Sequence, residues 1–452
     1  MATWWLTEAI PLSATALLPL IVFPVAGVLT FSAAASPYAS EVIFLFMGGF
    51  ILGLAMERSG LHTRVALLTL LLVGTSPKRL VGGIMLASAM VSMWVSNTAT
   101  AIMMLPIALS VIALVRERHA PPNTPPGERQ SPDPNFESAL VLGVAYAASI
   151  GGVATLIGSP PNAVFKGFVQ ATLHHQVGFV DWMKVTLPLV AVFLPLAWFY
   201  MTSVSLPIRL KEVSGSRAMI RGELAALGRI GRGEWVVLIV FLLTVALWLF
   251  RPTLADLGEA HGVAGLRALN DASISLFSCL LLFIIPINLR QRVFAMDWKT
   301  AERLPWGALI LFGGGLSLAA AIAANGLDLY LGQFFTGLAG FPTWLIVVVL
   351  VAFVIFASEL ASNTAVATAI LPVLAAAAPS MGIDPFRLLI PATIAASLAF
   401  MLPVGTPPNA IVYATGRVTM GRMLRTGFGL NILAIVMITT ATELFGHWVA
   451  HK

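Results

Sequence analysis

The chain has 452 residues, of which 58% are hydrophobic and only 10% are charged. A soluble protein carries roughly 25% charged residues, because its surface must face water. The mean hydropathy is +0.91, and several near-charge-free stretches are long enough to cross a bilayer. This composition excludes a soluble enzyme, a disordered protein and a disulfide-rich secreted scaffold, and it predicts an all-α polytopic membrane protein.

The charge balance of 26 Lys and Arg against 20 Asp and Glu gives a net charge of +6. The basic residues lie in short loops between apolar runs, as expected of cytoplasmic connections, so no nucleic-acid partner is predicted. The single cysteine, Cys279, has no second cysteine with which to form an intramolecular disulfide. The N-terminal residues enter an apolar span without a basic leader or a small-residue cleavage site, so we expect no cleavable signal sequence.

Apolar segments follow one another along the chain, and several are too short to span a bilayer or are interrupted by Gly, Pro, Ser and Asn. They cover residues 4–30, 41–56, 65–73, 80–115, 139–165, 185–207, 235–250, 272–287, 306–324, 343–357, 365–378, 388–415 and 428–446. Because irregular backbone is not tolerated against lipid, such interruptions must be buried in protein or line a polar cavity.

Two polar stretches separate these segments. Arg116 to Glu137 is rich in proline and predicts an aqueous linker, whereas Arg209 to Arg232 is basic and predicts a cytoplasmic amphipathic connector. A specific lipid or partner site is the alternative interpretation of the basic stretch. Both stretches are expected on the cytoplasmic side. His174 and His175 lack the spacing of a metal-binding HExxH motif, and no metal site is predicted there.

The second half of the chain repeats motifs of the first half. Two pairs share an offset of 266 positions and a third has an offset of 247: Gly48-Gly49 with Gly314-Gly315, Ser96-Asn97-Thr98 with Ser362-Asn363-Thr364, and GSPPN at Gly158 with GTPPN at Gly405. Three paired motifs in the same order indicate an internal duplication. Duplicated polar breaks in a membrane protein point to a transporter binding site, and we expect the repeats to be inverted because opposed repeats give two related access states. The glycine pairs, with Gly313, are expected to pack helices instead.

Each Ser-Asn-Thr triplet lies between two short apolar arms, residues 80–95 and 99–115 in the first repeat and residues 343–361 and 365–378 in the second. This pattern predicts a helical hairpin that enters the membrane and turns back. At such a turn the second arm presents free backbone N–H groups, which suit an anion. Backbone carbonyls, Ser hydroxyls and Asn amide oxygens at the same turn suit Na⁺.

The Pro-Pro motifs predict a second type of helix break, because proline cannot continue the hydrogen-bond ladder. The hydroxyls of Ser159 and Thr406 and the amides of Asn162 and Asn409 are then neutral groups available to a ligand. A single Asn or Thr in a membrane helix usually forms a hydrogen bond that holds two helices together, but the paired set favours ligand or ion binding.

Among the hairpin arms Glu359 is the one acidic residue, and the arms contain no Lys, Arg, Asp or His. The carboxylate or histidine relay that is typical of proton coupling is therefore missing, and Na⁺ fits the oxygen ligands as the coupling ion. Glu359 is interpreted either as a hydrogen-bonding partner that stabilises the hairpin or as a coupling residue.

These motifs resemble those of the divalent anion:sodium symporter family, which includes di- and tricarboxylate transporters and some sulfate transporters. The resemblance rests on TWWLTEAIPLSATALLPL at the start, both SNT triplets, GSPPN, and FMLPVGTPPNAIVYATG from Phe400, and it covers essentially the whole chain. It implies two inverted repeats, each with a re-entrant hairpin and a broken transmembrane helix. It also implies a transport domain that slides as an elevator past a dimeric scaffold.

Site residues carried over from the resemblance fall on the same motifs. The first sodium site would use Ser92, Ser96, Asn97 and Gly158, the second Ser358, Ala361, Asn363 and Gly405, and the substrate site Asn97, Thr98, Ser159, Pro160, Asn363, Thr364, Thr406 and Pro407. Family members usually carry one more apolar helix before TWWLTEAIP, so we expect either an upstream start or a truncation. Ser159 stands where the second repeat has Thr406, a conservative change that could tune substrate size.

The expected domains are scaffold and dimerisation helices at 1–79, the first transport repeat at 80–206, a basic connector with scaffold helices at 207–342 and the second transport repeat at 343–452. The predicted function is sodium-coupled transport of C4 dicarboxylates such as succinate across the cytoplasmic membrane, with no enzymatic activity and no organic cofactor. The predicted partners are the dicarboxylate, Na⁺, the lipid bilayer and a second copy of the chain. Alternatives are a sodium-independent dicarboxylate exchanger, a sodium/sulfate or sodium/citrate symporter and, from other classes, an ion channel or a membrane enzyme.

Overall fold

The computed structural model describes residues 1–7, 9–74, 76–119, 131–210, 212–213, 215–327, 330 and 340–445. Within these ranges nine helices are long and apolar enough to cross a membrane. The described strands are two short ones, β1 (Pro286–Asn288) and β2 (Val293–Phe294), which pair antiparallel. The prediction of an α-helical polytopic membrane protein is confirmed. Glu8 of the N-terminal motif and residues 120–130 of the Pro-rich linker lie outside the described residues.

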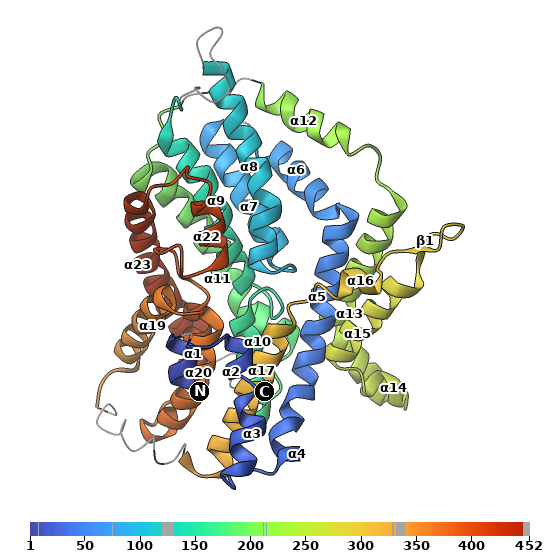
Figure 1. Ribbon diagram of the computed structural model, residues 1–452, viewed down its shortest axis with the longest axis vertical. Coiled ribbons are helices and arrows are strands. Elements are labelled where there is room, and N and C mark those ends of the chain that lie inside the picture. Colours follow the sequence, from blue (N-terminus) through green and yellow to red (C-terminus); the bar gives the residue numbers. More distant parts are fainter. Residues whose placement is uncertain are drawn as a thin grey trace.

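The chain contains both long spans and short, interrupted helices (Figure 1). The first half contains α1 (Ala2–Thr7), α2 (Leu12–Thr15), α3 (Leu18–Val25), α4 (Phe31–Ala35), the 3₁₀ turn η1 (Ser36–Ala39), α5 (Glu41–Ser59), α6 (Leu61–Val73), α7 (Pro77–Ser92), α8 (Asn97–His119), α9 (Pro134–Val153), α10 (Pro160–Thr172), α11 (Phe179–Phe199) and the π-helical turn η3 (Tyr200–Ser205). The second half contains α12 (Ser216–Ala226), α13 (Arg232–Ala260), α14 (Ala264–Arg267), α15 (Asp271–Ile284), α16 (Trp298–Ala301), α17 (Trp306–Ala324), α19 (Thr343–Leu360), α20 (Asn363–Ser380), α21 (Phe386–Ala396), α22 (Pro407–Tyr413) and α23 (Met420–Phe445).

Both predicted hairpins are present. Helices α7 and α8 form the first and α19 and α20 form the second, and the Ser-Asn-Thr triplet lies at the turn in each. The two hairpins extend from opposite ends of the molecule and their turns lie in its middle (Figure 1). The repeats are therefore inverted. Each second arm begins at the Asn of the triplet, two residues earlier than the sequence predicted.

Each repeat also contains the predicted broken helix. Helices α9 and α10 flank the break before the first Pro-Pro motif, and α21 and α22 flank the break before the second. The pieces after the breaks pack against the opposite repeat, because α10 contacts α20 and α22 contacts α8. Each hairpin is thus held by a helix of the other repeat, which brings the four polar motifs into one region.

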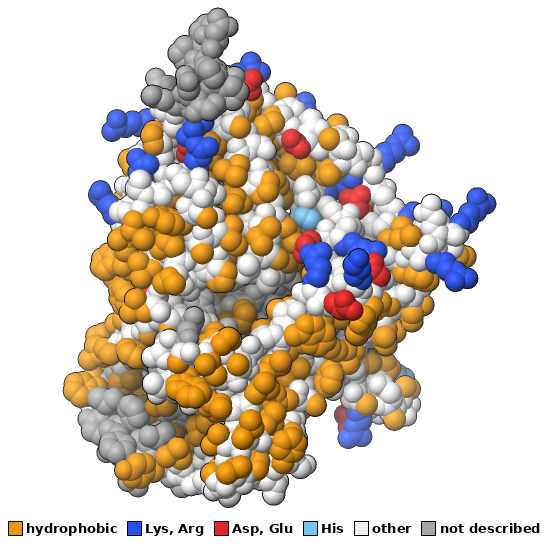
Figure 2. Space-filling view, viewed as in Figure 1, with side chains coloured by type: hydrophobic (Ala, Val, Ile, Leu, Met, Phe, Trp, Pro, Cys, Tyr) orange, Lys and Arg blue, Asp and Glu red, His pale blue; other side chains and the backbone are white. Residues whose placement is uncertain are grey.

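The end of the molecule that carries the base of the first hairpin is rich in basic residues (Figure 2). The C-terminal end of α8 and helix α12 both lie at this end (Figure 1). Exposed cations here are Lys78, Arg79, Arg118, Arg209, Arg217, Arg221, Arg229 and Arg232. By the positive-inside tendency, this end is the one expected to face the cytoplasm.

The glycine pairs lie at close helix contacts, as predicted. A Cβ atom on Gly48 would lie 2.7 Å from the Ser275 carbonyl oxygen, and one on Gly314 would lie 2.7 Å from Ala16 Cβ. Cβ atoms do not approach other atoms this closely, so the absence of a side chain lets α5 pack on α15 and α17 pack on α2. Gly48 and Gly314 thus serve packing between helices outside the hairpins, whereas a Cβ atom on Gly315 would lie 2.5 Å from Thr368 Cγ2 of α20.

Replacing Gly314 by Val is expected to lower the melting temperature of the purified protein by several degrees, because overpacking at such a contact costs about 1–3 kcal/mol. Gly421→Ala is the matched control, since a Cβ atom there meets nothing within 4 Å. A Gly314→Val protein as stable as the Gly421→Ala protein would contradict the packing role. The measurement is thermal unfolding in detergent.

Candidate substrate and cation site

The two hairpin turns place helix N-termini in the middle of the molecule. Ser96 precedes α8 and its hydroxyl accepts a hydrogen bond from the Ala99 N–H (3.4 Å). Ser362 precedes α20 and its carbonyl accepts one from the Val366 N–H (2.9 Å). The N-terminus of a helix carries a partial positive charge. The N-termini of α8 and α20 therefore both make the electrostatic potential of this region positive, which favours an anion.

The first predicted sodium set converges on the Asn97 side chain. The Asn97 amide oxygen accepts a hydrogen bond from Ser92 Oγ (2.6 Å). The same end of the amide lies 3.3 Å from the Gly158 carbonyl oxygen and 3.0 Å from the Ala148 carbonyl oxygen. Oxygen atoms that face one another repel unless a cation lies between them. With the amide turned over, its nitrogen would donate to the same three oxygens, so either a cation or a rotated amide satisfies the cluster.

Gly158 belongs to this cluster because of its backbone. A Cβ atom on Gly158 would lie 2.6 Å from the Gly152 carbonyl oxygen and 2.9 Å from the Ser92 carbonyl oxygen. Three members of the predicted set, Ser92, Asn97 and Gly158, therefore meet, and the fourth, Ser96, caps α8 beside them. This collection of hydroxyl, amide and carbonyl oxygens fits a small hard cation such as Na⁺.

The second predicted sodium set lies at the turn between α19 and α20. Ser358 Oγ and Asn363 Oδ1 are buried and accept or donate no hydrogen bond within the described part of the chain. Ala361 is the C-cap residue of α19, so its carbonyl lies at the same turn. A Cβ atom on Gly405 would lie 3.2 Å from the Glu359 carbonyl oxygen. Buried oxygen atoms without partners are costly, and a bound cation would satisfy them.

Glu359, for which the sequence left two interpretations, is engaged in hydrogen bonds. Its Oε1 accepts from the backbone N–H groups of Phe400 (2.6 Å) and Met401 (2.8 Å), and its Oε2 accepts from that of Leu402 (3.0 Å). The amide of Asn431 donates a further bond to Oε1 (2.8 Å). Glu359 therefore holds the interrupted segment before GTPPN, which supports the interpretation as a stabilising partner.

The amides of Asn162 and Asn409 were expected to be available to a ligand, but their N–H donors are already used within the protein. Each is fully buried, and its Nδ2 donates to two carbonyls of its own helix break. Asn162 donates to Gly152 (3.1 Å) and Thr155 (2.8 Å), and Asn409 donates to Ala399 and Leu402 (both 3.1 Å). The donors of these amides are used to hold the breaks, because carbonyls freed by the Pro-Pro motif need partners inside a membrane.

The predicted substrate residues divide into two groups by their surroundings. Asn97, Thr98, Asn363 and Pro160 are half-buried and Pro407 is exposed. The other three, Ser159, Thr364 and Thr406, are buried. The Ser159 hydroxyl lies 2.8 Å from that of Ser397, and Thr406 Oγ1 accepts from the Asn409 N–H (3.2 Å).

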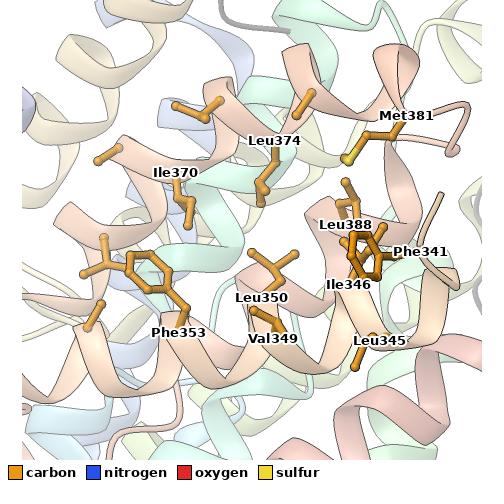
Figure 3. A pocket seen from close by; sticks show the side chains of 15 residues that line it. Phe341, Leu345, Ile346, Val349, Leu350, Phe353, Ile370, Leu374, Met381 and Leu388 are labelled. Atoms are coloured by element: carbon orange, nitrogen blue, oxygen red, sulfur yellow. The ribbon is translucent and has the colours of Figure 1, made fainter. Parts of the chain in front are cut away.

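A separate cavity of about 690 Å³ lies between the arms of the second hairpin (Figure 3). Side chains of α19 and α20 line it, with Phe341, Met381 and the α21 residue Leu388, and every lining residue is apolar. Val349 and Phe353 are both 61% exposed at its edge. A dianion needs hydrogen-bond donors, so this cavity is not the substrate site.

Several residues with a role at the breaks were not found from the sequence. Thr155 donates from its hydroxyl to the Met93 carbonyl and accepts from the Gly158 N–H (3.1 Å), which fixes the first turn against the first break. A Thr three residues after a Gly-Gly pair in an apolar run gives no signal of this contact. Asn431 is a polar residue within the apolar run 428–446 and could have been singled out.

The comparisons with known proteins agree with these features. Residues 1–451 match the family model described as the sodium:sulfate symporter transmembrane region. The sodium-dependent dicarboxylate transporter SdcS of Staphylococcus saprophyticus is 44% identical over 440 residues, which are 97% of this chain and 83% of that protein. The protein of the same name from Staphylococcus aureus strain NCTC 8325 is 42% identical over 441 residues, 97% of this chain and 82% of that protein.

A solved structure, that of the Alcanivorax borkumensis YdaH transporter, shares the fold with a TM-score of 0.63 at 16% identity, over 98% of this chain and 97% of that chain. The near-complete family match and the identity to the SdcS proteins go further than this shared fold. The chain is an integral multi-pass membrane protein and belongs to the sodium:sulfate symporter family, the divalent anion:sodium symporters that its motifs resemble.

Proposed function

We propose that the protein is a sodium-coupled secondary transporter that carries C4 dicarboxylates such as succinate into the cell across the cytoplasmic membrane. The cluster of uncharged polar groups of Ser92, Asn97 and Gly158, matched in the inverted repeat by Ser358, Asn363 and Gly405, carries this proposal. The relatives that match nearly the whole chain are named sodium-dependent dicarboxylate transporters, which supports the same ion and substrate class. Such transport needs neither covalent chemistry nor an organic cofactor.

The proposed binding residues share one property, which is that none carries a formal charge. They are Asn97, Thr98, Ser159, Pro160, Asn363, Thr364, Thr406 and Pro407 for the dicarboxylate, with Ser92, Ser96, Asn97 and Gly158 for one Na⁺ and Ser358, Ala361, Asn363 and Gly405 for the other. Sodium ions then supply the charge that balances the dianion. Each net positive charge that enters gains about 2.3 kcal/mol per 100 mV of membrane potential, so excess Na⁺ makes uptake uphill.

Succinate is expected to raise the melting temperature of the purified protein in Na⁺ but not in K⁺, because the anion binds only beside its cations. Asn97→Ala and Asn363→Ala should each abolish this stabilisation. Thr440→Ala is the matched control, since Thr440 is exposed and hydrogen-bonds only within its own helix. Retained stabilisation in both Asn variants would contradict the site assignment.

Thermal stabilisation by other anions, together with uptake into proteoliposomes, separates the alternative substrates and modes of transport. Stabilisation by sulfate or citrate but not by succinate would favour a sodium/sulfate or sodium/citrate symporter. In proteoliposomes, uptake that requires internal dicarboxylate and ignores a sodium gradient would favour the exchanger. Saturable, sodium-driven succinate uptake is the expected outcome.

We also propose an elevator movement, in which residues 80–206 and 343–452 slide past a scaffold of residues 1–79 and 207–342 that forms a homodimer. Helix α10 of the transport part packs against α17 and α5 of the scaffold part. Its Lys166 pairs with Asp271 of α15 (Nζ to Oδ2, 2.7 Å), and its Gln170 donates to Glu41 of α5 (3.1 Å). These contacts must separate if α10 slides.

Joining α10 to α5 is therefore expected to stop transport without stopping binding. Glu41→Cys and Gln170→Cys, combined in a Cys279→Ser background, are cross-linked with a short bifunctional thiol reagent. Succinate uptake should fall at least about tenfold, while sodium-dependent thermal stabilisation by succinate is retained. The two single-cysteine variants treated with the same reagent are the controls. Uptake at the uncross-linked rate in the joined protein would overturn the elevator proposal.

A further inference from the structure

Beyond the bonds from Asn162 and Asn409, which the two helix breaks share, the breaks are held by different further hydrogen bonds. In the first repeat, α11 donates to the carbonyls of the break, because Trp182 Nε1 bonds Val153 (2.9 Å) and Thr186 Oγ1 bonds Ala154 (2.9 Å). The residues 247 positions later are Phe400 and Met401. In the second repeat, it is the N–H groups of these residues that are held, and their acceptor is Glu359.

The difference places a charge in one repeat that the other lacks. Glu359 is 3% exposed and accepts all four of its hydrogen bonds, three from backbone N–H groups and one from Asn431. Met93 stands 266 positions earlier, where the first repeat has the residue equivalent to Glu359. Methionine contributes only its backbone carbonyl, which Thr155 uses. The first cation cluster is therefore built from neutral groups.

Helix α23 also contacts Glu359, through Asn431. Asn431 donates to its Oε1 at 2.8 Å and is itself fully buried. Gly427, four residues earlier and so on the same face of α23, lies against the break, because a Cβ atom there would lie 2.6 Å from Met401 Cα. The carboxylate therefore has a fixed position between α23 and the segment that leads to Gly405.

The carboxylate also borders the second cation site. A Cβ atom on Gly405 would lie 3.1 Å from Glu359 Oε2, and the unpartnered hydroxyl of Ser358 belongs to the preceding residue. A negative charge attracts a nearby cation more strongly in a buried, low-dielectric region than in water. The second cation site therefore has a carboxylate beside it, whereas the first cation site has none.

We propose that Glu359 and Asn431 are positioning residues for the second sodium site, and that the Glu359 charge makes this site bind Na⁺ more tightly than the first. The second site then fills at a lower Na⁺ concentration than the first. This inference rests on the proposed sodium coupling.

The test is the sodium dependence of thermal stabilisation without substrate, with choline chloride replacing NaCl at constant ionic strength. Glu359→Gln, which removes the charge and keeps the shape, should raise the half-saturating Na⁺ concentration at least about tenfold. Asn431→Ala, which removes one of four donors, should raise it about two- to fivefold. The midpoint for succinate at saturating Na⁺ should stay within about twofold in Asn431→Ala. Thr442→Val is the control, since this buried residue of α23 bonds only Ile438.

The order of filling is tested with one variant in each site. Ser358→Ala should raise the sodium midpoint measured without substrate more than Ser92→Ala does, whereas Ser92→Ala should mainly raise the Na⁺ needed for succinate binding. The reverse ranking would overturn the order.

The remaining outcomes distinguish failure of the positioning role from failure of the proposed function. Wild-type sodium midpoints in both Glu359→Gln and Asn431→Ala would overturn the positioning role, whatever their melting temperatures. If Glu359→Gln does not fold, Asn431→Ala decides alone. A wild-type protein without any sodium-dependent stabilisation would instead refute the proposed function.

Discussion

Hydrocarbon offers no hydrogen-bond partners, so each backbone group that leaves a helix inside a membrane protein must find a partner in the protein itself. This chain interrupts its helices at two hairpin turns and two Pro-Pro breaks, and the surrounding structure supplies those partners. Asn162 and Asn409 solve the same problem in the same way, each donating to two carbonyls of its own break. The polar region between the repeats exists because these breaks are held open and satisfied.

A neutral polar site imposes a condition on any anion that enters it. The helix N-termini at Asn97 and Asn363 provide partial charge, but no described cationic side chain lies among the proposed binding residues. Lys166 of α10 is a buried cation, but it is paired with Asp271, and both side chains are 5% exposed or less. A buried ion pair of this type contributes little net stability, but it fixes the register of the helices it joins. The charge that balances a dicarboxylate must therefore come from ions in solution.

Much of this architecture could be predicted from the sequence, because polar, helix-breaking residues within apolar runs have few physical explanations. The duplication, the two hairpins and the broken helices followed from the motifs at Asn97, Asn363, Gly158 and Gly405. The inversion was expected from the logic of alternating access, and the opposite directions of the two hairpins confirm it. The starts of α8 and α20 differed by two residues, since the Asn of each triplet already adopts helical geometry.

What could not be predicted depends on contacts between residues far apart in the chain. Lys166 and Asp271 are separated by 105 positions, and neither spacing nor composition connects them. The direction of the Asn162 and Asn409 amides was missed for a related reason. A sequence shows which donors a segment contains, but it does not show which carbonyls compete for them once the break has formed.

Duplication has preserved the packing between the repeats and the bonds from Asn162 and Asn409, but not the other bonds that hold each break. The crossed contacts of α10 with α20 and of α22 with α8 are retained in both directions, because they determine how the hairpins face one another. A break, in contrast, can be held through its carbonyls, as Trp182 and Thr186 do, or through its N–H groups, as Glu359 does. Either solution satisfies the backbone, so the choice was free to diverge. Only the second introduces a charge, and a pair of sites with the same shape can thereby acquire different electrostatics.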